Sequence, residues 1–331
     1  AGTSTSPGGE CYGVVLVALD VGFDMGVGNL IQDAGAVVVT ISDAVAELTN
    51  EALLEGSALT RIVAGKVVAQ MAAVKNLFPA AKPMDFQGTQ HLLVPHGPTE
   101  AFLLRKLGFD VPAPILAHYP WPGMVTPFDV QKKTAALMTL NQRAYVLNDL
   151  GTGKSKTLLW AWDYLRSNNL CGKLLILAPL STLNFTWARE GFATLPHRKC
   201  VVRHGSKAQR LARLCDHDVE IFILNHDGVE VLFHELMARP DIDTLGIDEL
   251  AVYRNGGTDR TKYVMKLAAR MKWAWGMTGR PIPRAPTDTW AQAKLLTPHT
   301  VPKFFGRYRE DLMIKSAHSV FQWFPKPDAA E

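Results

Sequence analysis

The segment Leu147–Ser155 restricts the possible folds of this chain more than any other. It reads Leu-Asn-Asp-Leu-Gly-Thr-Gly-Lys-Ser, follows an apolar run from Ala144, and leads into a helical pattern that continues to Arg166. A strand, a glycine-containing loop and a helix in this order let consecutive backbone N–H groups surround a phosphate, and the helix adds its positive N-terminal end. The segment therefore predicts a phosphate-binding loop inside an α/β domain.

Two side chains of this loop have separate expected roles. We expect Lys154 to reach the β- and γ-phosphates of a nucleotide and the Ser155 hydroxyl to bind Mg²⁺. Asn148 stands where the usual pattern, G-x-x-x-x-G-K-[ST], has its first glycine. Judged alone, the loop is compatible with an ordinary glycine-rich turn that carries a surface lysine.

Strand and helix patterns alternate from residue 127 to residue 278. The expected strands are 144–147, 173–179, 199–203, 219–225, 244–248 and 273–278, and the expected helices are 127–138, 156–166, 183–192, 206–215, 228–238 and 262–271. Such alternation is typical of a parallel sheet with helices on both faces. Ligands of these sheets bind at the carboxyl ends of the strands.

The residues before this domain divide into two regions. Residues 1–60 carry no chemical motif; short strands are expected at 14–17 and 36–41, a helix at 42–54, and the region is a candidate for poor order. Residues 61–123 predict a small α+β accessory region, with a helix at 62–78, a strand at 90–95 and a helix at 98–107. It ends in a proline-rich linker, so the main domain is expected at 124–331.

The adjacent carboxylates Asp248 and Glu249 follow the fifth expected strand of the domain. In an enzyme with a phosphate-binding loop, the first would hold Mg²⁺ and the second would orient and deprotonate the attacking water. The alternative is a solvated acidic pair at the end of a strand. The order of loop and acidic pair along one sheet favours the catalytic interpretation.

Two further motifs complete the pattern. Gln131 lies 22 residues before Gly153 on a predicted helix, where its amide can read the edge of an adenine. The turn Thr278–Gly279 ends the last strand, and its hydroxyl is placed to contact the acidic pair and relay the state of a nucleotide.

Together these motifs resemble the first motor lobe of superfamily II helicases, nearest to the Swi/Snf-type branch and its phage-encoded members. The resemblance covers about residues 85–331. The matching segments are Phe128–Gln131, Asn148–Ser155, Leu177–Leu183 with Trp187 and Glu190, Ile223–His226, Asp248–Glu249, Thr278–Pro283, Trp290 with Gln292, and Phe304–Arg309.

The resemblance implies a RecA-like lobe that binds ATP with Mg²⁺ and moves on DNA, most simply duplex DNA. Its implied nucleotide contacts are Gln131, Asp149, Gly151, Thr152, Gly153, Lys154, Ser155 and Lys156, with Lys154, Asp248 and Glu249 catalytic and Ser155 and Asp248 on the metal. Its implied nucleic-acid contacts are Pro179, Ser181 and Asn225, and its coupling residues are Thr278 and Gly279.

The chain departs from the family at three places. Leu250 and Ala251 replace the usual residues after the acidic pair, and Arg280 replaces a threonine. The family's second lobe, with its arginine finger, has no counterpart before residue 331. We therefore expect a fragment or one part of a split helicase, completed by a second RecA-like lobe in cis or in trans, with weak hydrolysis by the chain alone.

Two other functions stay open. A non-hydrolysing nucleic-acid-binding or regulatory module can keep the shape of this lobe. The second open function is that of the motor part of a restriction-type translocase, although residues 1–120 show no Asp…Glu-x-Lys nuclease pattern.

Charge and cysteine content bear on partners and location. Residues 1–80 hold three basic and eight acidic residues, against 32 and 23 in the remainder, so the motif-bearing part is basic. That excess suits a polyanionic partner or a solvated surface. The four cysteines form no C-x-x-C pair, and the apolar run 12–30 contains two aspartates and follows no basic segment. We expect a cytoplasmic protein, in the host cytoplasm if phage-encoded, without a signal peptide or membrane span.

Overall fold

The computed structural model describes residues 13–14, 36–40, 76–86, 89–106, 111–203, 216, 218–316 and 322–327. Contacts divide the chain into two compact units, residues 1–119 and 120–331. The predicted boundaries at residues 60 and 123 stay predictions. The predicted helices 42–54 and 206–215, and most of 62–78, lie outside the described residues, as do nearly all of the basic residues between 203 and 213. No helix in the described ranges is long and apolar enough to cross a membrane.

The first unit contains a four-stranded antiparallel sheet in the order β1-β2-β4-β3. Its elements are β1 (Gly13–Val14), β2 (Ala36–Thr40), β3 (Lys82–Phe86), β4 (Thr89–His96), α4 (Pro98–Lys106) and α5 (Ile115–His118). The strand predicted at 90–95 and the helix predicted at 98–107 are confirmed. No candidate site residue lies in this unit.

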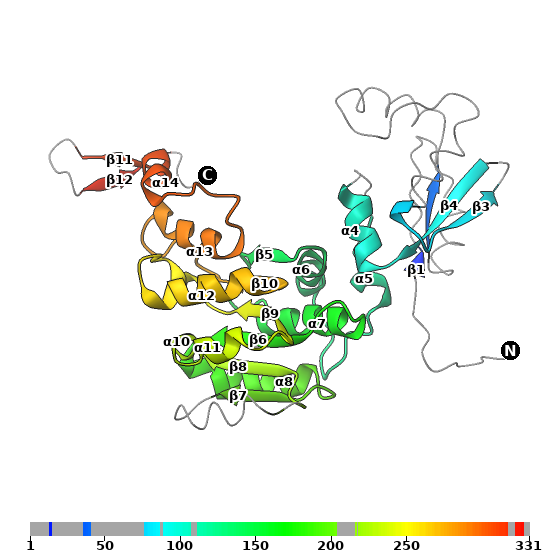
Figure 1. Cartoon of the computed structure of the whole chain (residues 1–331), viewed down its shortest axis with the longest axis horizontal. Coiled ribbons are helices and arrows are strands. Elements are labelled where there is room, and N and C mark those ends of the chain that lie inside the picture. Colours follow the sequence, from blue (N-terminus) through cyan, green and yellow to red (C-terminus); the bar gives the residue numbers. More distant parts are fainter. Residues whose placement is uncertain are drawn as a thin grey trace. The chain divides into compact units, whose positions relative to one another are not determined.

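The second unit is built on a six-stranded sheet in the order β5-β10-β9-β6-β8-β7, and every pairing in it is parallel. The strands are β5 (Arg143–Val146), β6 (Lys173–Ala178), β7 (Cys200–Arg203), β8 (Ile221–Asn225), β9 (Ile242–Ile247) and β10 (Trp273–Met277). The main helices are α6 (Asp129–Leu140), α7 (Lys154–Ser167), α8 (Arg189–Thr194), α10 (Gly228–Val231), α11 (Phe233–Met237), α12 (Asp259–Arg270) and α13 (Thr289–Leu296). The predicted RecA-like α/β lobe is confirmed (Figure 1).

Helices cover both faces of this sheet, which explains why its central strands are buried at nearly every position and mostly apolar. All five residues of β8 and of β10 are buried, so neither strand shows the alternation of a half-exposed strand. On one face, Leu158 of α7 packs against Gly246 of β9. On the other face, Gly276 of β10 lies under Leu296 of α13 and Leu250.

Short helical turns and a hairpin complete the second unit. They are η1 (Leu180–Thr182), the π-helix η2 (Leu183–Ala188), η3 (Leu250–Tyr253), η4 (Pro286–Asp288), α14 (Phe305–Leu312), β11 (Met313–Lys315) and β12 (Trp323–Pro325). The predicted helix 183–192 is confirmed, although its first half, Leu183 to Ala188, is a π-helix. That difference bears directly on the site.

Gly276→Val tests the packing of the second face. A Cβ at this position would stand 2.6 Å from Leu296 Cδ1 and 2.7 Å from Leu250 Cδ2, and valine adds two more methyl groups. We expect a loss of about 1–3 kcal/mol in the free energy of unfolding, because overpacked cores strain their neighbours. Urea unfolding followed by tryptophan fluorescence measures it, since all eight tryptophans lie in residues 120–331.

The matched control for this prediction is Gly306→Ala. No atom lies within 4 Å of a Cβ built on Gly306 in α14. This variant is expected to be neutral or more stable by up to about 1 kcal/mol, because alanine favours helix over glycine. Equal unfolding curves for the parent and Gly276→Val would contradict the packing described here.

Candidate nucleotide site

The predicted phosphate loop forms a turn between β5 and α7, and the conformation of this turn requires glycine. Gly151 and Gly153 have φ of 79° and 72°, in the left-handed region that residues with a Cβ rarely adopt. At Gly153 a Cβ would also stand 2.0 Å from Gln131 Nε2. Gly153 is the residue before the first turn of α7, so the loop ends at the positive end of a fourteen-residue helix.

Lys154 folds back over the loop. Its Nζ donates hydrogen bonds to the carbonyl oxygens of Asn148, at 3.0 Å, and Asp149, at 2.8 Å. The loop carbonyls thus hold the ammonium group at the mouth of the turn. Thr152 Oγ1 also donates to the Asp149 carbonyl, at 2.9 Å, which closes the turn between them.

Asn148, the residue that replaces the usual glycine, links the loop to α6. Its Nδ2 donates to Thr134 Oγ1 at 2.8 Å, and Thr134 in turn donates to the Val130 carbonyl at 2.7 Å. A glycine could not make this contact. The substitution therefore supplies an anchor for the start of the loop.

Gln131 is a second link between α6 and the loop. Its side chain is only 3% exposed. Its Oε1 accepts the Phe128 N–H at 2.8 Å, and its Nε2 donates to the Gly153 carbonyl at 3.3 Å. One N–H of the amide keeps its hydrogen-bonding capacity. Reading of adenine by Gln131 stays a prediction, whereas its contact with the loop is observed.

The acidic pair lies at the end of β9, in the same cavity as the loop. Asp248 N–H donates to the Leu177 carbonyl at 2.8 Å, which extends the pairing of β9 with β6 by one residue. Glu249 then adopts φ 52° and ψ 56°, a left-handed conformation that costs about 1–3 kcal/mol in residues other than glycine. This turn directs the chain from the sheet into η3.

Trp187 positions the first carboxylate. Its Nε1 donates to Asp248 Oδ2 at 3.0 Å, while Asp248 Oδ1 accepts the Glu249 N–H at 3.1 Å. Trp187 is fully buried and belongs to the π-helix η2, whose wider turn rotates the following side chains relative to an α-helix. The sequence places Trp187 in a segment that resembles a helicase motif, but its bond to Asp248 depends on a helix type that the sequence pattern does not reveal.

Burial raises the pKa of both carboxyl groups. For Asp248 the rise due to burial is opposed by the hydrogen bonds from Trp187 and Glu249 and by the charge of Lys154. For Glu249 burial acts first and the neighbouring Asp248 second, and Lys154 again opposes them. The two acids and the lysine therefore form one electrostatic group.

One cavity of about 390 Å³ brings these groups together. Its lining residues are Gly151, Gly153, Lys154, Ser155, Lys156, Thr186, Glu190, Asp248 and Glu249. Lys156 Nζ lies 3.5 Å from Glu190 Oε2, an ion pair without hydrogen-bond geometry that joins α7 to α8. Loop amides, an ammonium group, a hydroxyl and two carboxylates are the groups that bind a polyphosphate with Mg²⁺, so these residues fit both.

The predicted coupling turn lies beside the loop, but its hydroxyl has another partner. A Cβ at Gly279 would stand 3.2 Å from Leu150 Cδ2, so the turn packs on the phosphate loop. Thr278 is fully buried, and its Oγ1 accepts the Arg280 N–H at 3.3 Å. Within the described ranges no hydrogen bond joins the Thr278 hydroxyl to either carboxylate. The coupling role of this turn stays a prediction.

The three residues predicted to contact nucleic acid lie at neighbouring strand ends outside this cavity. Pro179 and Ser181 follow β6, and Asn225 ends β8, where it pairs with Ala178 of β6. Asn225 Oδ1 is buried and has no hydrogen-bond partner within the described residues. Beside it, His226 Nδ1 forms a 2.8 Å hydrogen bond with the Tyr253 hydroxyl.

Comparisons with known proteins found similarity among solved structures. Neither family models nor curated proteins match the sequence. Among solved structures, the chain is similar to the SWI2/SNF2 ATPase core of Sulfolobus solfataricus in complex with dsDNA, with 22% identity and a TM-score of 0.49 over 58% of this chain and 40% of that one. It is also similar to the SWI2/SNF2 ATPase core domain of the same organism, with 20% identity and a TM-score of 0.48 over 58% and 39%. The chain thus spans about two fifths of each structure.

Glu249→Gln tests the electrostatics of the acidic pair. Because the folded-state pKa of Glu249 is raised, the ionised side chain lowers stability at pH values above that pKa. The glutamine variant should therefore be more stable than the parent at pH 8, by on the order of 0.5 kcal/mol since water screens a partly exposed pair.

This gain should shrink as the pH falls through the raised pKa and vanish below the unfolded value of about 4.3. Thermal unfolding of both proteins from pH 8 to pH 4 measures it. A gain that stays constant over this range would contradict the assigned repulsion.

Proposed function

We propose that this chain is the ATP-binding lobe of an ATP-dependent DNA translocase of the Swi/Snf type. One observation carries the proposal: a single cavity holds the glycine loop, Lys154, Ser155 and the Asp248–Glu249 pair. The ordered motifs of the sequence, from Gln131 to Thr278, support the choice of this family over other phosphate-loop enzymes. DNA as the partner follows from the same motif resemblance.

Different residues of the cavity would bind the phosphates and the metal ion. The loop N–H groups and Lys154 would bind the β- and γ-phosphates, with Nζ leaving the carbonyl oxygens of Asn148 and Asp149. The Ser155 hydroxyl and the Asp248 carboxylate would hold Mg²⁺, which supplies neutralisation of the charge that develops on the phosphates. Trp187 holds the Asp248 carboxylate in place for this task.

Glu249 would act as the general base. Water attacks the γ-phosphorus, the bond from that phosphorus to the β–γ bridging oxygen breaks, and the proton of the water passes to the Glu249 carboxylate. A raised pKa brings this carboxylate nearer to neutrality, where a general base works best. The left-handed backbone at Glu249 fixes where the carboxylate stands.

A second RecA-like lobe, in cis or in trans, would complete the site. No arginine occurs among the residues that line the nucleotide cavity. In phosphoryl transfer an arginine from a facing surface raises the rate by about 10³–10⁵. We therefore expect the chain alone to bind ATP well and to hydrolyse it slowly.

Lys154→Ala tests nucleotide binding. Removal of the ammonium group should weaken the binding of a fluorescent ATP analogue with Mg²⁺ by about tenfold or more, because a charge-assisted contact to phosphate is lost. Lys262→Ala, on the exposed face of α12, removes an equal charge and should bind as the parent does. Equal affinity of Lys154→Ala and the parent would exclude the proposal.

Glu249→Gln separates binding from hydrolysis. This variant should keep nucleotide affinity and lose about 10²-fold or more in the hydrolysis rate, as expected for loss of a general base. Single-turnover hydrolysis with and without duplex DNA and a second lobe supplied in trans measures it. If the parent binds ATP and DNA never raises its hydrolysis rate, the non-hydrolysing regulatory function is the correct one.

A further inference from the structure

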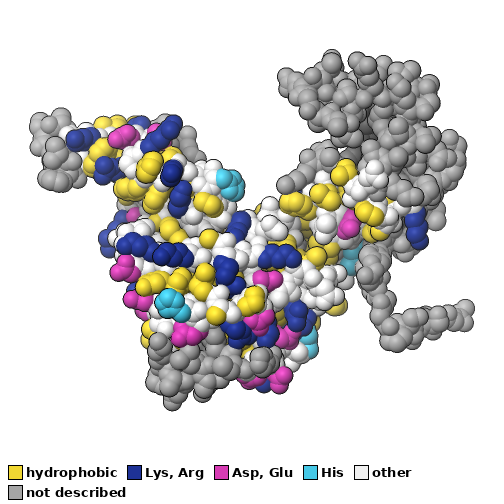
Figure 2. All heavy atoms as spheres, viewed as in Figure 1, with side chains coloured by type: hydrophobic (Ala, Val, Ile, Leu, Met, Phe, Trp, Pro, Cys, Tyr) yellow, Lys and Arg dark blue, Asp and Glu magenta, His cyan; other side chains and the backbone are white. Residues whose placement is uncertain are grey.

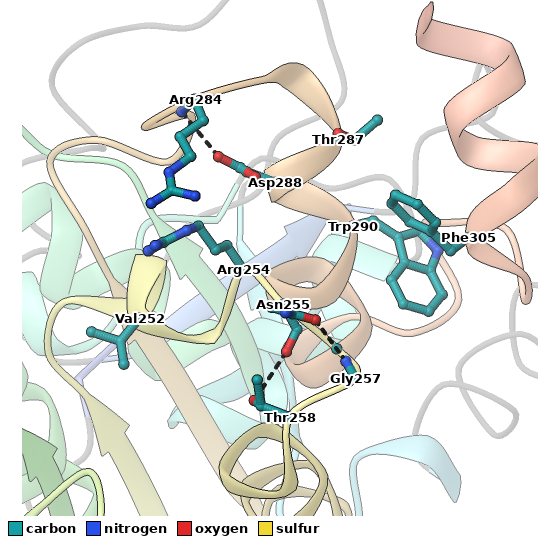
Figure 3. A pocket seen from close by; sticks show the side chains of 11 residues that line it. Val252, Arg254, Asn255, Gly257, Thr258, Arg284, Thr287, Asp288, Trp290 and Phe305 are labelled. Carbon is teal, nitrogen blue, oxygen red and sulfur yellow. Dashed lines mark hydrogen bonds between the residues drawn. The ribbon is translucent and has the colours of Figure 1, made fainter. Parts of the chain in front are cut away.

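A second cavity, of about 570 Å³, lies in the same unit and shares no lining residue with the nucleotide cavity. It is bordered by the segment after η3, which leads into α12, and by the segment after β10, which leads through η4 into α13. Arg254 comes from the first segment and Arg284 from the second, while Trp290 and Phe305 form another part of the wall (Figure 3). No predicted nucleotide or nucleic-acid residue lines this cavity.

Two unpaired positive charges line this cavity. Neither guanidinium group forms an ion pair with any residue that the structure describes, and Arg254 makes one long hydrogen bond, 3.4 Å, to the Ala251 carbonyl. Figure 3 shows both side chains extending to the same side of the cavity. The one carboxylate in the wall is that of Asp288. Its Oδ2 accepts hydrogen bonds from the backbone N–H groups of Arg284 and Ala285, not from the guanidinium group. Like charges held together in this way favour the binding of an anion.

The backbone adds to the positive potential. Gly256, Gly257 and Thr258 line the cavity immediately before the first residue of the twelve-residue helix α12. The N-terminal end of a helix carries a partial positive charge. On the visible surface of the second unit, Lys and Arg side chains lie among Asp and Glu side chains (Figure 2), so the two arginines and the helix end set the potential of the cavity. An anion in this cavity would therefore be attracted from two sides.

The aromatic wall favours a nucleic-acid strand over a small anion. Trp290 and Phe305 meet edge to face with centroids 5.6 Å apart, and the Trp290 ring is fixed by a 3.0 Å hydrogen bond from Nε1 to the Pro302 carbonyl. Phe305 remains 40% exposed. An apolar surface beside two guanidinium groups suits the sugar next to a backbone phosphate.

We propose that this cavity binds a backbone phosphate of nucleic acid on Arg254 and Arg284, with the adjoining sugar against Phe305. The choice of nucleic acid as the ligand rests on the proposed function, whereas the anion site rests on the geometry alone. The site adds a contact surface to the strand ends that carry Pro179, Ser181 and Asn225.

The test measures affinity and its salt dependence on a fluorescein-labelled DNA duplex of random sequence. The double variant Arg254→Ala/Arg284→Ala should bind about tenfold more weakly at low salt. The slope of log affinity against log salt concentration should fall by about 1, because fewer phosphate counterions are released. Phe305→Ala should bind about threefold more weakly with an unchanged slope, since it removes only an apolar contact.

The double variant Lys262→Ala/Lys266→Ala is the matched control. It removes two positive charges from exposed positions of α12, outside the cavity. The proposal requires that its salt slope stay that of the parent. Equal losses in the arginine and lysine variants, or none in either, would overturn the site.

Two measurements separate this site from the nucleotide site. The arginine double variant should bind the fluorescent ATP analogue as the parent does, and Lys154→Ala should bind the duplex without nucleotide as the parent does. If Lys154→Ala keeps ATP affinity, the proposed function fails while the arginine result stands. If millimolar inorganic phosphate stabilises the parent but not the arginine variant, and both bind DNA equally, the cavity binds small phosphates and the nucleic-acid assignment is overturned.

Discussion

The parallel pairing of six buried strands is the constraint on which the rest of the second unit depends. In such a sheet the carboxyl ends of all strands meet at one edge. The order β5-β10-β9 places the phosphate loop, the turn Thr278–Gly279 and the acidic pair after three neighbouring strands, although up to about 130 residues separate them in the sequence. Gly246 and Gly276 let a helical layer approach each face of these strands. The packing of the core therefore decides which side chains can share a cavity.

The candidate site contains groups that lower the stability of the fold, and the buried sheet offsets their cost. Asp248 is buried with a raised pKa, Glu249 has a left-handed backbone, and Lys154 is held on two carbonyl oxygens instead of an acid. The buried carboxyl group and the left-handed backbone are unfavourable for folding, whereas the two hydrogen bonds of Lys154 are favourable. The nearby network from Tyr145 to Gln292, in which Gln292 Nε2 donates to the Pro281 and Asp288 carbonyls, supports the same edge with satisfied hydrogen bonds. Glu249 thus carries backbone strain at the site itself, while Trp121 and Asn169 have positive φ elsewhere in this unit.

Much of this arrangement can be predicted from local sequence patterns, and the remainder depends on contacts between distant parts of the chain. Alternating apolar strands and helices predicted the parallel sheet, and the glycines at 151 and 153 predicted the loop, because both depend on short-range patterns. The order of the strands is a property of tertiary packing. The bond from Trp187 to Asp248 depends on a π-helix. Arg254 and Arg284, which lie 30 residues apart in the sequence, line one cavity without belonging to a shared motif. Long-range contacts of this kind leave no spacing for sequence reasoning to detect.

The two cavities are joined by two short segments of chain, and this connection bears on how the lobe would work. Residues 248–258 begin with the acidic pair in the nucleotide cavity, pass through η3, and reach Arg254 in the second cavity. Tyr253, between them, is held to the end of β8 by His226. The segment 278–288 likewise begins against Leu150 of the phosphate loop and continues to Arg284. Both arginines lie only five or six residues beyond groups at the nucleotide cavity. A backbone shift at Glu249 or Gly279 must therefore be absorbed within η3 or the turn, or it moves the guanidinium groups. The proposed coupling between ATP and DNA would thus have a route through the backbone that does not require the Thr278 hydroxyl to contact the acidic pair.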